Sequence, residues 1–346
     1  MTQPAVAEPA AVPSPREQGW GKVALATLAL LLVPLTPLLR VLLPVDRTAL
    51  LLAPALAAVS VAGWMAGGRG ALAVAWTAVA AWSVSQLSGA GLFSLLQAGW
   101  ALLVAGIFGA GVAFRRAHPE PMLTQALRAI GIATAVSLVV TAAVPGGPGR
   151  VANAVAAEAG SRADESRTAW REMTSRAEWK DFVAQNPQAG EMAKAVDAQL
   201  ASLPVTARTL FPALAALEAL GALAVAWALY HRIGRSRIGP PLGRLREFRF
   251  NDHMVWGVVG GLALVLIPGF AAARAVGANL LLFFGALYTI RGAGVFLWMV
   301  SPGRLASAFL VIVAVLFWNV LGVMALGLGV GDTWLDWRAR ARARKT

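Results

Sequence analysis

The chain has 346 residues, a length that would suit two or three soluble domains, but its composition argues against them. Hydrophobic residues make up 58% of the sequence and charged residues only 14%, whereas a soluble globular protein has about a quarter charged residues. The net charge is +13. The absence of cysteine excludes disulfides, cysteine-ligated metal sites and thiol nucleophiles. We therefore expect an integral membrane protein.

Nine apolar runs follow residues 1–21, whose Ala, Pro and Glu content is typical of a disordered N-terminal tail. A membrane-spanning helix needs about 20 mainly apolar residues. The runs that reach or approach this length are Val23–Leu43, Thr48–Ala66, Gly70–Leu87, Gly91–Phe114, Met122–Val144, Ala207–Tyr230, Met254–Ala273, Ala278–Val300 and Leu305–Val330. Because the second and third runs are short and closely coupled, the sequence predicts an all-α, polytopic transmembrane helix bundle of eight or nine spans.

The runs fall into two groups on either side of one long polar stretch. A first transmembrane helix group covers residues 22–144 and a second covers residues 206–331. Residues 145–205 between them predict an extramembrane helical segment, and residues 332–346 form a basic C-terminal tail. Glycines at a spacing of four, as in Gly257-x-x-x-Gly261, allow helices of the bundle to approach closely.

The extramembrane segment predicts two helices. The first covers residues 151–185 and ends at Asn186-Pro187, and a short second helix covers residues 189–203. Apolar side chains recur at helical spacing, at Trp170, Met173, Trp179, Phe182 and Val183. This stripe fits a hairpin packed on the membrane surface or on the rim of the bundle, and it also fits a lid or a docking element for a partner.

Charge in the short loops predicts the orientation of the chain. With the N-terminus in the cytoplasm, the cytoplasmic side carries 12 basic residues, namely Arg16, Lys22, Arg69, Arg115, Arg116, the six arginines of residues 232–249 and Arg304. The opposite side carries eight, which include the basic tail. We expect a multipass protein of the bacterial cytoplasmic membrane with a cytoplasmic N-terminus. Nine spans, however, place the tail and the basic loop on opposite sides, so either the last stretch is re-entrant or one of the last three runs does not cross.

Ionisable side chains inside a membrane are costly, so each is a candidate functional residue. Glu218 lies in the middle of the sixth run and Arg291 about midway along the eighth. Glu218 could bind a cation, a proton or a polar ligand, and Arg291 could hold an anionic group of a substrate. The two could also pair with one another and simply hold helices together.

Three further residues complete the candidate substrate-binding set. Asn279 and Asn319 carry amides that could contact a ligand or bridge helices. Pro268 should bend the seventh run and free backbone carbonyls, as broken helices do at binding sites near the middle of a membrane. The sequence contains no catalytic motif and no pair of histidines at metal-ligand spacing, so we expect neither an enzyme nor a metal or other cofactor.

The loop between the sixth and seventh runs is strongly basic and is the candidate docking surface. Its arginines are Arg232, Arg235, Arg237, Arg244, Arg246 and Arg249. Anionic lipids of the cytoplasmic leaflet are the simplest partner, and a membrane or cytosolic protein is the alternative. Nucleic acid is not expected, because no basic stretch belongs to a soluble domain.

Several stretches of the second half carry a resemblance to a known family. They are Leu203-Pro204, Phe211-Pro212, Tyr230–Gly234, Pro240–Phe248, Asn279–Gly285, Gly327–Asp332 and Asp336–Arg338. Their order resembles the YybS-like bacterial multipass membrane proteins, a domain family of unknown function, over roughly residues 20–340. Arg291 departs from the pattern, because that family more often has an uncharged polar residue before Gly292.

The hydrophobic layout of that family is similar to that of the substrate-binding subunits of energy-coupling-factor vitamin transporters, which lack an ATPase of their own. The resemblance implies a ligand held among helices near one membrane face and capped by a loop, although a fold does not fix a function. Two functions therefore stay open. One is a small-molecule binding or transport subunit, and the other is a non-transporting scaffold or assembly factor that acts through the basic loop or residues 145–205.

Overall fold

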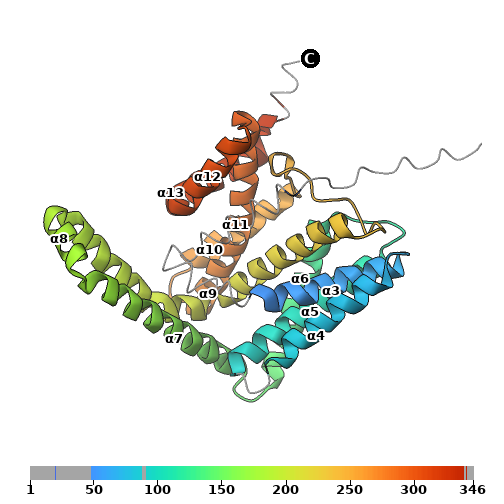
Figure 1. Cartoon of the computed structure of the whole chain (residues 1–346), viewed down its shortest axis with the longest axis horizontal. Coiled ribbons are helices and arrows are strands. Elements are labelled where there is room, and N and C mark those ends of the chain that lie inside the picture. Colours follow the sequence, from blue (N-terminus) through green and yellow to red (C-terminus); the bar gives the residue numbers. More distant parts are fainter. Residues whose placement is uncertain (1–19, 21–47, 88–90, 339, 341–346) are drawn as a thin grey trace, which may run out of the picture.

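The computed structural model describes residue 20 and residues 48–87, 91–338 and 340. In this part of the chain every regular element is a helix, as the sequence predicts (Figure 1). The first predicted run, Val23–Leu43, and residues 1–19 of the N-terminal tail lie outside the described residues.

Within residues 48–143, apart from the undescribed positions 88–90, the first helix group is a bundle of four helices. They are α3 (Thr48–Met65), α4 (Gly70–Ser85), α5 (Leu92–Phe114) and α6 (Met122–Ala143), and their bounds agree with the second to fifth predicted runs to within a few residues. The tight connection between α3 and α4 uses Gly67, whose φ of 85° is a left-handed conformation that favours glycine. Close packing of α3 on α5 depends on Gly109, because an added Cβ there would lie 3.0 Å from the Cβ of Ala58.

Three helices build an arm that projects from the bundle (Figure 1). They are α7 (Gly147–Ser175), α8 (Ala177–Gln185) and α9 (Pro187–Ile233), and the arm consists of α7, α8 and residues 187–208 of α9. The prediction of a short helix over residues 189–203 is wrong. Helix α9 has 47 residues and continues from the arm into the sixth predicted run, despite internal prolines at positions 204 and 212.

The second helix group contains α10 (Val255–Leu266), α11 (Ala271–Val300), α12 (Arg304–Leu316) and α13 (Trp318–Leu335). Pro268 does not bend a single helix, so that prediction is wrong. It lies in a reverse turn between α10 and α11, because proline cannot continue α10 and Gly269 adopts a left-handed φ of 78°. The C-terminal tail also begins later than expected, since Asp332 is still part of α13.

Glycines set the close contacts of this second group. The predicted role of Gly261 is confirmed, because an added Cβ on the facing Gly277 of α11 would lie 2.6 Å from the carbonyl oxygen of Gly261. Where α11 crosses α13, a Cβ on Gly292 would overlap the backbone of Ala325, and one on Gly329 would overlap the backbone of Tyr288. No residue larger than glycine fits at this crossing unless the helices separate.

Four described helices are long and apolar enough to cross a membrane, namely α5, α6, α9 and α11. A fifth is possible if the broken pair α12–α13, which bends by 108°, forms one span. The apolar helices α3, α4 and α10 are shorter. Helix α10 has 12 residues, or about 18 Å at 1.5 Å per residue, against a hydrocarbon core of about 30 Å.

The main core lies where α9 passes between α3, α5 and α6, and α11 adds Leu287 to it. Trp227 of α9 is fully buried and meets Phe108 of α5 edge to face, with ring centroids 5.9 Å apart. The indole nitrogen of Trp227 donates a hydrogen bond to the carbonyl of Pro240. The core thereby fixes the start of the loop that follows α9.

Several loops meet at one end of the molecule. We call it the basic end, and it consists of the connections after α3 and α5 and the loop of residues 232–249. Arg116 donates to the carbonyl of Met65 at 3.1 Å, and Ser236 donates to that of Gly63 at 2.7 Å. These bonds join the connections after α3, α5 and α9.

Arg338 donates to the carbonyls of Arg246 and Phe248, both at 3.2 Å, so the chain after α13 also lies at the basic end.

Candidate functional site

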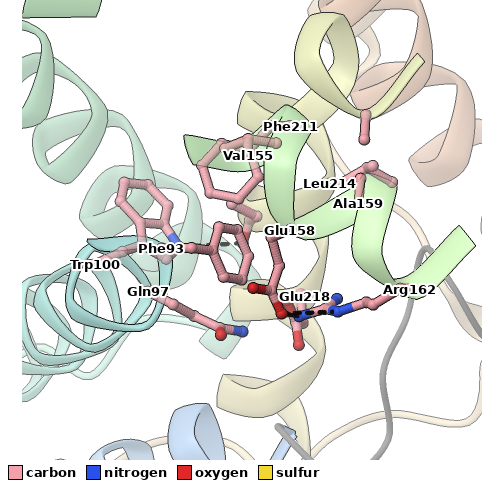
Figure 2. A pocket seen from close by; sticks show the side chains of 12 residues that line it. Phe93, Gln97, Trp100, Val155, Glu158, Ala159, Arg162, Phe211, Leu214 and Glu218 are labelled. Atoms are coloured by element: carbon pink, nitrogen blue, oxygen red, sulfur yellow. Dashed lines mark hydrogen bonds and ion pairs between the residues drawn. The ribbon is translucent and has the colours of Figure 1, made fainter. Parts of the chain in front are cut away.

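A small cavity lies where the arm joins the bundle (Figure 2). Its volume is about 50 Å3, and its walls come from α5, α7 and α9. The lining residues are Phe93, Gln97, Trp100, Val155, Glu158, Ala159, Arg162, Ala207, Phe211, Leu214, Ala215 and Glu218. It contains Glu218, the ionisable residue that the sequence places in the middle of a span.

The polar groups of the cavity gather at one end. Figure 2 shows the side chains of Gln97, Glu158, Arg162 and Glu218 converging there. Arg162 donates two hydrogen bonds to Oε1 of Glu158, from Nε at 3.1 Å and from Nη2 at 2.9 Å. Glu218 is attracted electrostatically by Arg162, but no hydrogen bond joins its carboxylate to another side chain in the described part of the chain. The polar end therefore has two carboxylates and one guanidinium.

Gln97 supplies a further acceptor at the polar end. The residue is 6% exposed, and its Oε1 is buried without a hydrogen-bond partner among the described residues. An unpaired buried acceptor costs about 1–3 kcal/mol, so it marks a place where a donor could bind.

Aromatic rings form the wall opposite the arm. Phe93 of α5 and Phe211 of α9 meet edge to face at 5.8 Å, and the guanidinium carbon of Arg162 lies 5.3 Å from the centroid of the Phe93 ring. Trp100 is held in place by a hydrogen bond of 3.2 Å from its Nε1 to the carbonyl of Ala215. The cavity thus combines anionic oxygens with aromatic faces.

A gap in the backbone hydrogen bonding of α9 at Pro212 lies beside the cavity and is bridged by α11. Pro212 has no N–H, so it cannot donate to the carbonyl of Arg208. The Asn279 side chain accepts from the N–H of Ala213 at 2.9 Å and donates to the carbonyl of Thr209 at 2.7 Å. Asn279 therefore supports the wall of the cavity from outside and does not line it.

Arg291 lies in a different cluster, and the predicted alternative in which it pairs with Glu218 is wrong. It is 2% exposed and binds two carboxylates, Asp332 at 3.0 Å and Asp252 at 2.6 Å. Asp332 also accepts from Arg338 at 2.6 Å, and both of these residues are 1% exposed. Two buried arginines thus share one buried carboxylate, while the fourth member, Asp252, is 61% exposed. This arrangement fastens the C-terminal end of the chain to α11.

The other predicted site residues are separate from the cavity. Asn319 is exposed at the start of α13, and Pro268 is exposed in its turn. Among the arginines of the basic loop, four are exposed, namely Arg235, Arg237, Arg244 and Arg249. In the same loop Arg249 forms an ion pair with Asp336, and Arg232 donates to the carbonyl of Ala228 at 2.7 Å. None of these residues lines the cavity, so no ligand contact is assigned to them.

The arm itself is held together by charge. Arg167 of α7 donates from Nε and Nη2 to the two carboxylate oxygens of Asp197 in α9, at 3.0 and 3.1 Å. Hydrogen bonding to Arg167 lowers the pKa of the Asp197 carboxyl below its ordinary value and raises the pKa of Arg167. Trp170 and Trp179, whose rings lie 6.1 Å apart, join α7 to α8. These contacts set the position of the α7 residues that reach the cavity.

Sequence reasoning found Glu218 but missed its neighbours from the arm. Glu158 and Arg162 lie four residues apart in a segment rich in charge, where such a pair usually faces water. It also missed Asp252 and Asp332 as partners of Arg291, and Arg338 as the second partner of Asp332. A buried pair 41 residues apart leaves no local pattern, although charged residues next to Gly331 and Trp337 were a usable signal.

Apolar helices of spanning length, one of which buries Arg291, define this chain as an integral membrane protein that is helical throughout its described regular structure. The family described as "Predicted membrane protein (DUF2232)" matches residues 24–333, and the chain belongs to that family. The expected membership of a membrane-protein family of unknown function is thereby confirmed. Comparisons with curated proteins and with solved structures found no match.

Proposed function

We propose that this protein is a small-molecule binding or transport subunit of the bacterial cytoplasmic membrane, without an ATPase of its own, and that the cavity at the base of the arm is its binding site. The observation that supports this most directly is Glu218, a carboxylate in an apolar helix that lines a cavity and makes no hydrogen bond with the described side chains. A charge in such a place costs stability unless a ligand, ion or proton uses it. A purely structural glutamate would be expected to have a partner.

The size of the cavity restricts the ligand. A single water needs about 10–15 Å3 on the same scale, so a volume of about 50 Å3 holds on the order of four water molecules. Sites for drug-sized ligands measure about 300–1,000 Å3. A vitamin, as the likeness to energy-coupling-factor subunits would imply, fits only if the arm moves away from α5. The cavity as it stands suits a ligand of a few non-hydrogen atoms.

The experiment is a binding screen on the full chain in detergent or nanodiscs. Cationic, anionic, zwitterionic and neutral small molecules are tested for thermal stabilisation of the wild type and of Glu218→Gln, which removes the charge and keeps the shape. Ligands of the cavity stabilise the wild type and lose this effect in Glu218→Gln. The matched control is Glu165→Gln on the exposed face of α7, which removes the same charge away from the cavity.

The proposal fails if no compound stabilises the wild type, or if every compound that does so stabilises Glu218→Gln equally. Retained binding in Glu165→Gln is required as well, because a loss there would mean that overall charge, and not the cavity, determines the result.

A scaffold or assembly factor is the second candidate, and the arm favours it. The tip of the arm carries a ring cluster of Trp170, Trp179 and Phe182, and Phe182 is 49% exposed. Exposed aromatic residues are typical of protein interfaces. This function predicts a protein partner that is recovered in mild detergent and lost when Trp179 and Phe182 are replaced by serine. Persistence of the partner in that variant counts against the arm as its docking surface.

We further propose that the basic end faces the cytoplasm, with eight spans in the complete bundle and a re-entrant last stretch. Support comes from the clustering of Arg69, Arg115, Arg116 and the loop 232–249, whose positive charge suits the cytoplasmic side and its anionic lipids. The chain after α13 lies at the same end. The bent pair α12–α13 supplies the re-entrant stretch that such an arrangement needs.

A further inference from the structure

We propose that the ligand of the cavity is a small monovalent cation of the ammonium type, either a short alkylammonium ion or the ammonium group of a longer molecule. This inference rests on the proposed binding function and specifies its chemical class. It is carried by the juxtaposition of Glu218, the unpaired Oε1 of Gln97 and the aromatic wall.

The charge of the polar end favours a cation. Glu158 and Glu218 bring two negative charges and Arg162 one positive charge. The guanidinium of Arg162 directs both Nε and Nη2 to Glu158, so its strongest contacts go to that carboxylate. An anionic ligand would have to displace Glu158 and approach Glu218 as well. A cation restores neutrality without breaking the Glu158–Arg162 pair.

Gln97 shows what geometry the cation must have. Its buried oxygen can only accept a hydrogen bond, and so can the ionised carboxylate of Glu218. A ligand that satisfies both through hydrogen bonds therefore carries at least two N–H donors, and a metal cation such as sodium, which the two oxygens could also coordinate, is the competitor that the test includes. A primary ammonium group has three donors, whereas a proton can satisfy one acceptor only.

The aromatic wall supplies the remaining contacts. Cations bind over aromatic faces within about 6 Å of the ring centroid, and tryptophan is the strongest of these rings. The ring of Trp100 lines the cavity and is fixed by its bond to Ala215. That Arg162 already lies 5.3 Å above Phe93 shows that this wall accepts positive charge. An apolar stem on the ammonium group can lie against Phe211.

The test measures binding of methylammonium to the full chain in nanodiscs by calorimetry and thermal stabilisation. Sodium chloride and sodium acetate at equal ionic strength serve as controls for simple salt effects. We expect saturable binding of methylammonium and none of acetate. In Glu218→Gln binding weakens by about tenfold or more, the loss expected for one charge-assisted hydrogen bond.

Two further variants keep the result interpretable. Gln97→Leu removes the second acceptor and should also weaken binding, so the proposal stays testable if Glu218→Gln fails to fold. Glu165→Gln should bind like the wild type. Saturable binding of sodium ions or of acetate at this site, or methylammonium binding that is unchanged in both Glu218→Gln and Gln97→Leu, would overturn the inference.

The outcomes also separate this inference from the proposed function. If methylammonium does not bind but another class of compound binds in a way that depends on Glu218, the cation is wrong and the binding function stands. If no class of compound binds, both are wrong.

Discussion

Asn279 of α11 binds both backbone groups that a regular helix would pair with one another on either side of Pro212. It accepts from the N–H of Ala213 and donates to the carbonyl of Thr209, at 2.9 and 2.7 Å. A third bond, to the carbonyl of Ala275 at 2.8 Å, fixes the amide on its own helix. One side chain of the second helix group thus supports the point at which α9 leaves the arm. The cavity is lined by α9 residues on both sides of that point, so its shape depends on this bridge.

Replacing Asn279 by leucine should destabilise the protein by about 1–2 kcal/mol, because two backbone groups of an apolar helix lose their side-chain partner. In a Pro212→Ala background the N–H of Ala213 and the carbonyl of Thr209 can pair with each other, so the cost should shrink. A double-mutant cycle of unfolding in detergent measures this difference. The control is Asn319→Leu, which changes an exposed asparagine of α13. An equal cost of Asn279→Leu in both backgrounds would show that Asn279 acts elsewhere.

The carboxylate of Asp332 pairs with two arginines, Arg291 and Arg338, that are each at most 2% exposed. In Asp332→Asn these charges lose their shared buried partner, and the expected cost is about 3–5 kcal/mol. Unfolding in detergent, together with expression level, checks this value. Glu247→Gln is the comparison, since Glu247 is 60% exposed and pairs with Arg246 at the surface. That change should cost less than about 1 kcal/mol. Similar costs for the two variants would argue against a buried ion network.

The apolar pattern of the sequence predicts most of the fold because a lipid solvent selects it directly. Continuous apolar runs must form helices that satisfy their own backbone, so α5 and α6 end within a residue of prediction. The same logic fails for α9, which the sequence divides after residue 203 into a short helix and the sixth run, although the structure has one continuous helix. At Pro212, inside that helix, Asn279 completes the hydrogen bonding from 67 residues further along the chain. Nothing local to Pro212 contains that information.

For the candidate site too, the sequence predicts single residues but not the contacts between helices. The rule that charges inside a membrane are costly finds Glu218 and Arg291 from their apolar surroundings alone. It cannot tell that Glu218 lines a cavity whereas Arg291 is fully paired, because the partners of each come from other helices. Arg162 reaches the cavity only because α7 packs against α9. Periodicity describes one face of one helix, and the cavity requires three helices.

Acid should loosen the arm before it affects the bundle. The pKa of Asp197 is lowered from its ordinary value of 3.8 by its hydrogen bond to Arg167. A carboxyl whose pKa is lower in the folded state contributes stability above the ordinary value, and this contribution is lost as the pH falls through the lowered value. Amide hydrogen exchange across α7 and residues 187–208 should therefore increase below that range. Asp197→Asn should already show faster exchange at neutral pH and lose the acid dependence. An acid response that is the same in the variant would exclude this pair as its cause.

The C-terminal end should be on the same side of the membrane as the basic loop, because Arg338 binds the carbonyls of Arg246 and Phe248. The absence of native cysteine allows single-cysteine variants to test this without interference. Arg235→Cys reports the loop, Arg340→Cys reports the C-terminal end, and Glu178→Cys reports the arm. In right-side-out vesicles an impermeant thiol reagent should label position 178 directly, and positions 235 and 340 only after the membrane is opened. Labelling of position 340 together with position 178 would mean that α12–α13 crosses the membrane once more and that the Arg338 contact is absent from the protein in its membrane.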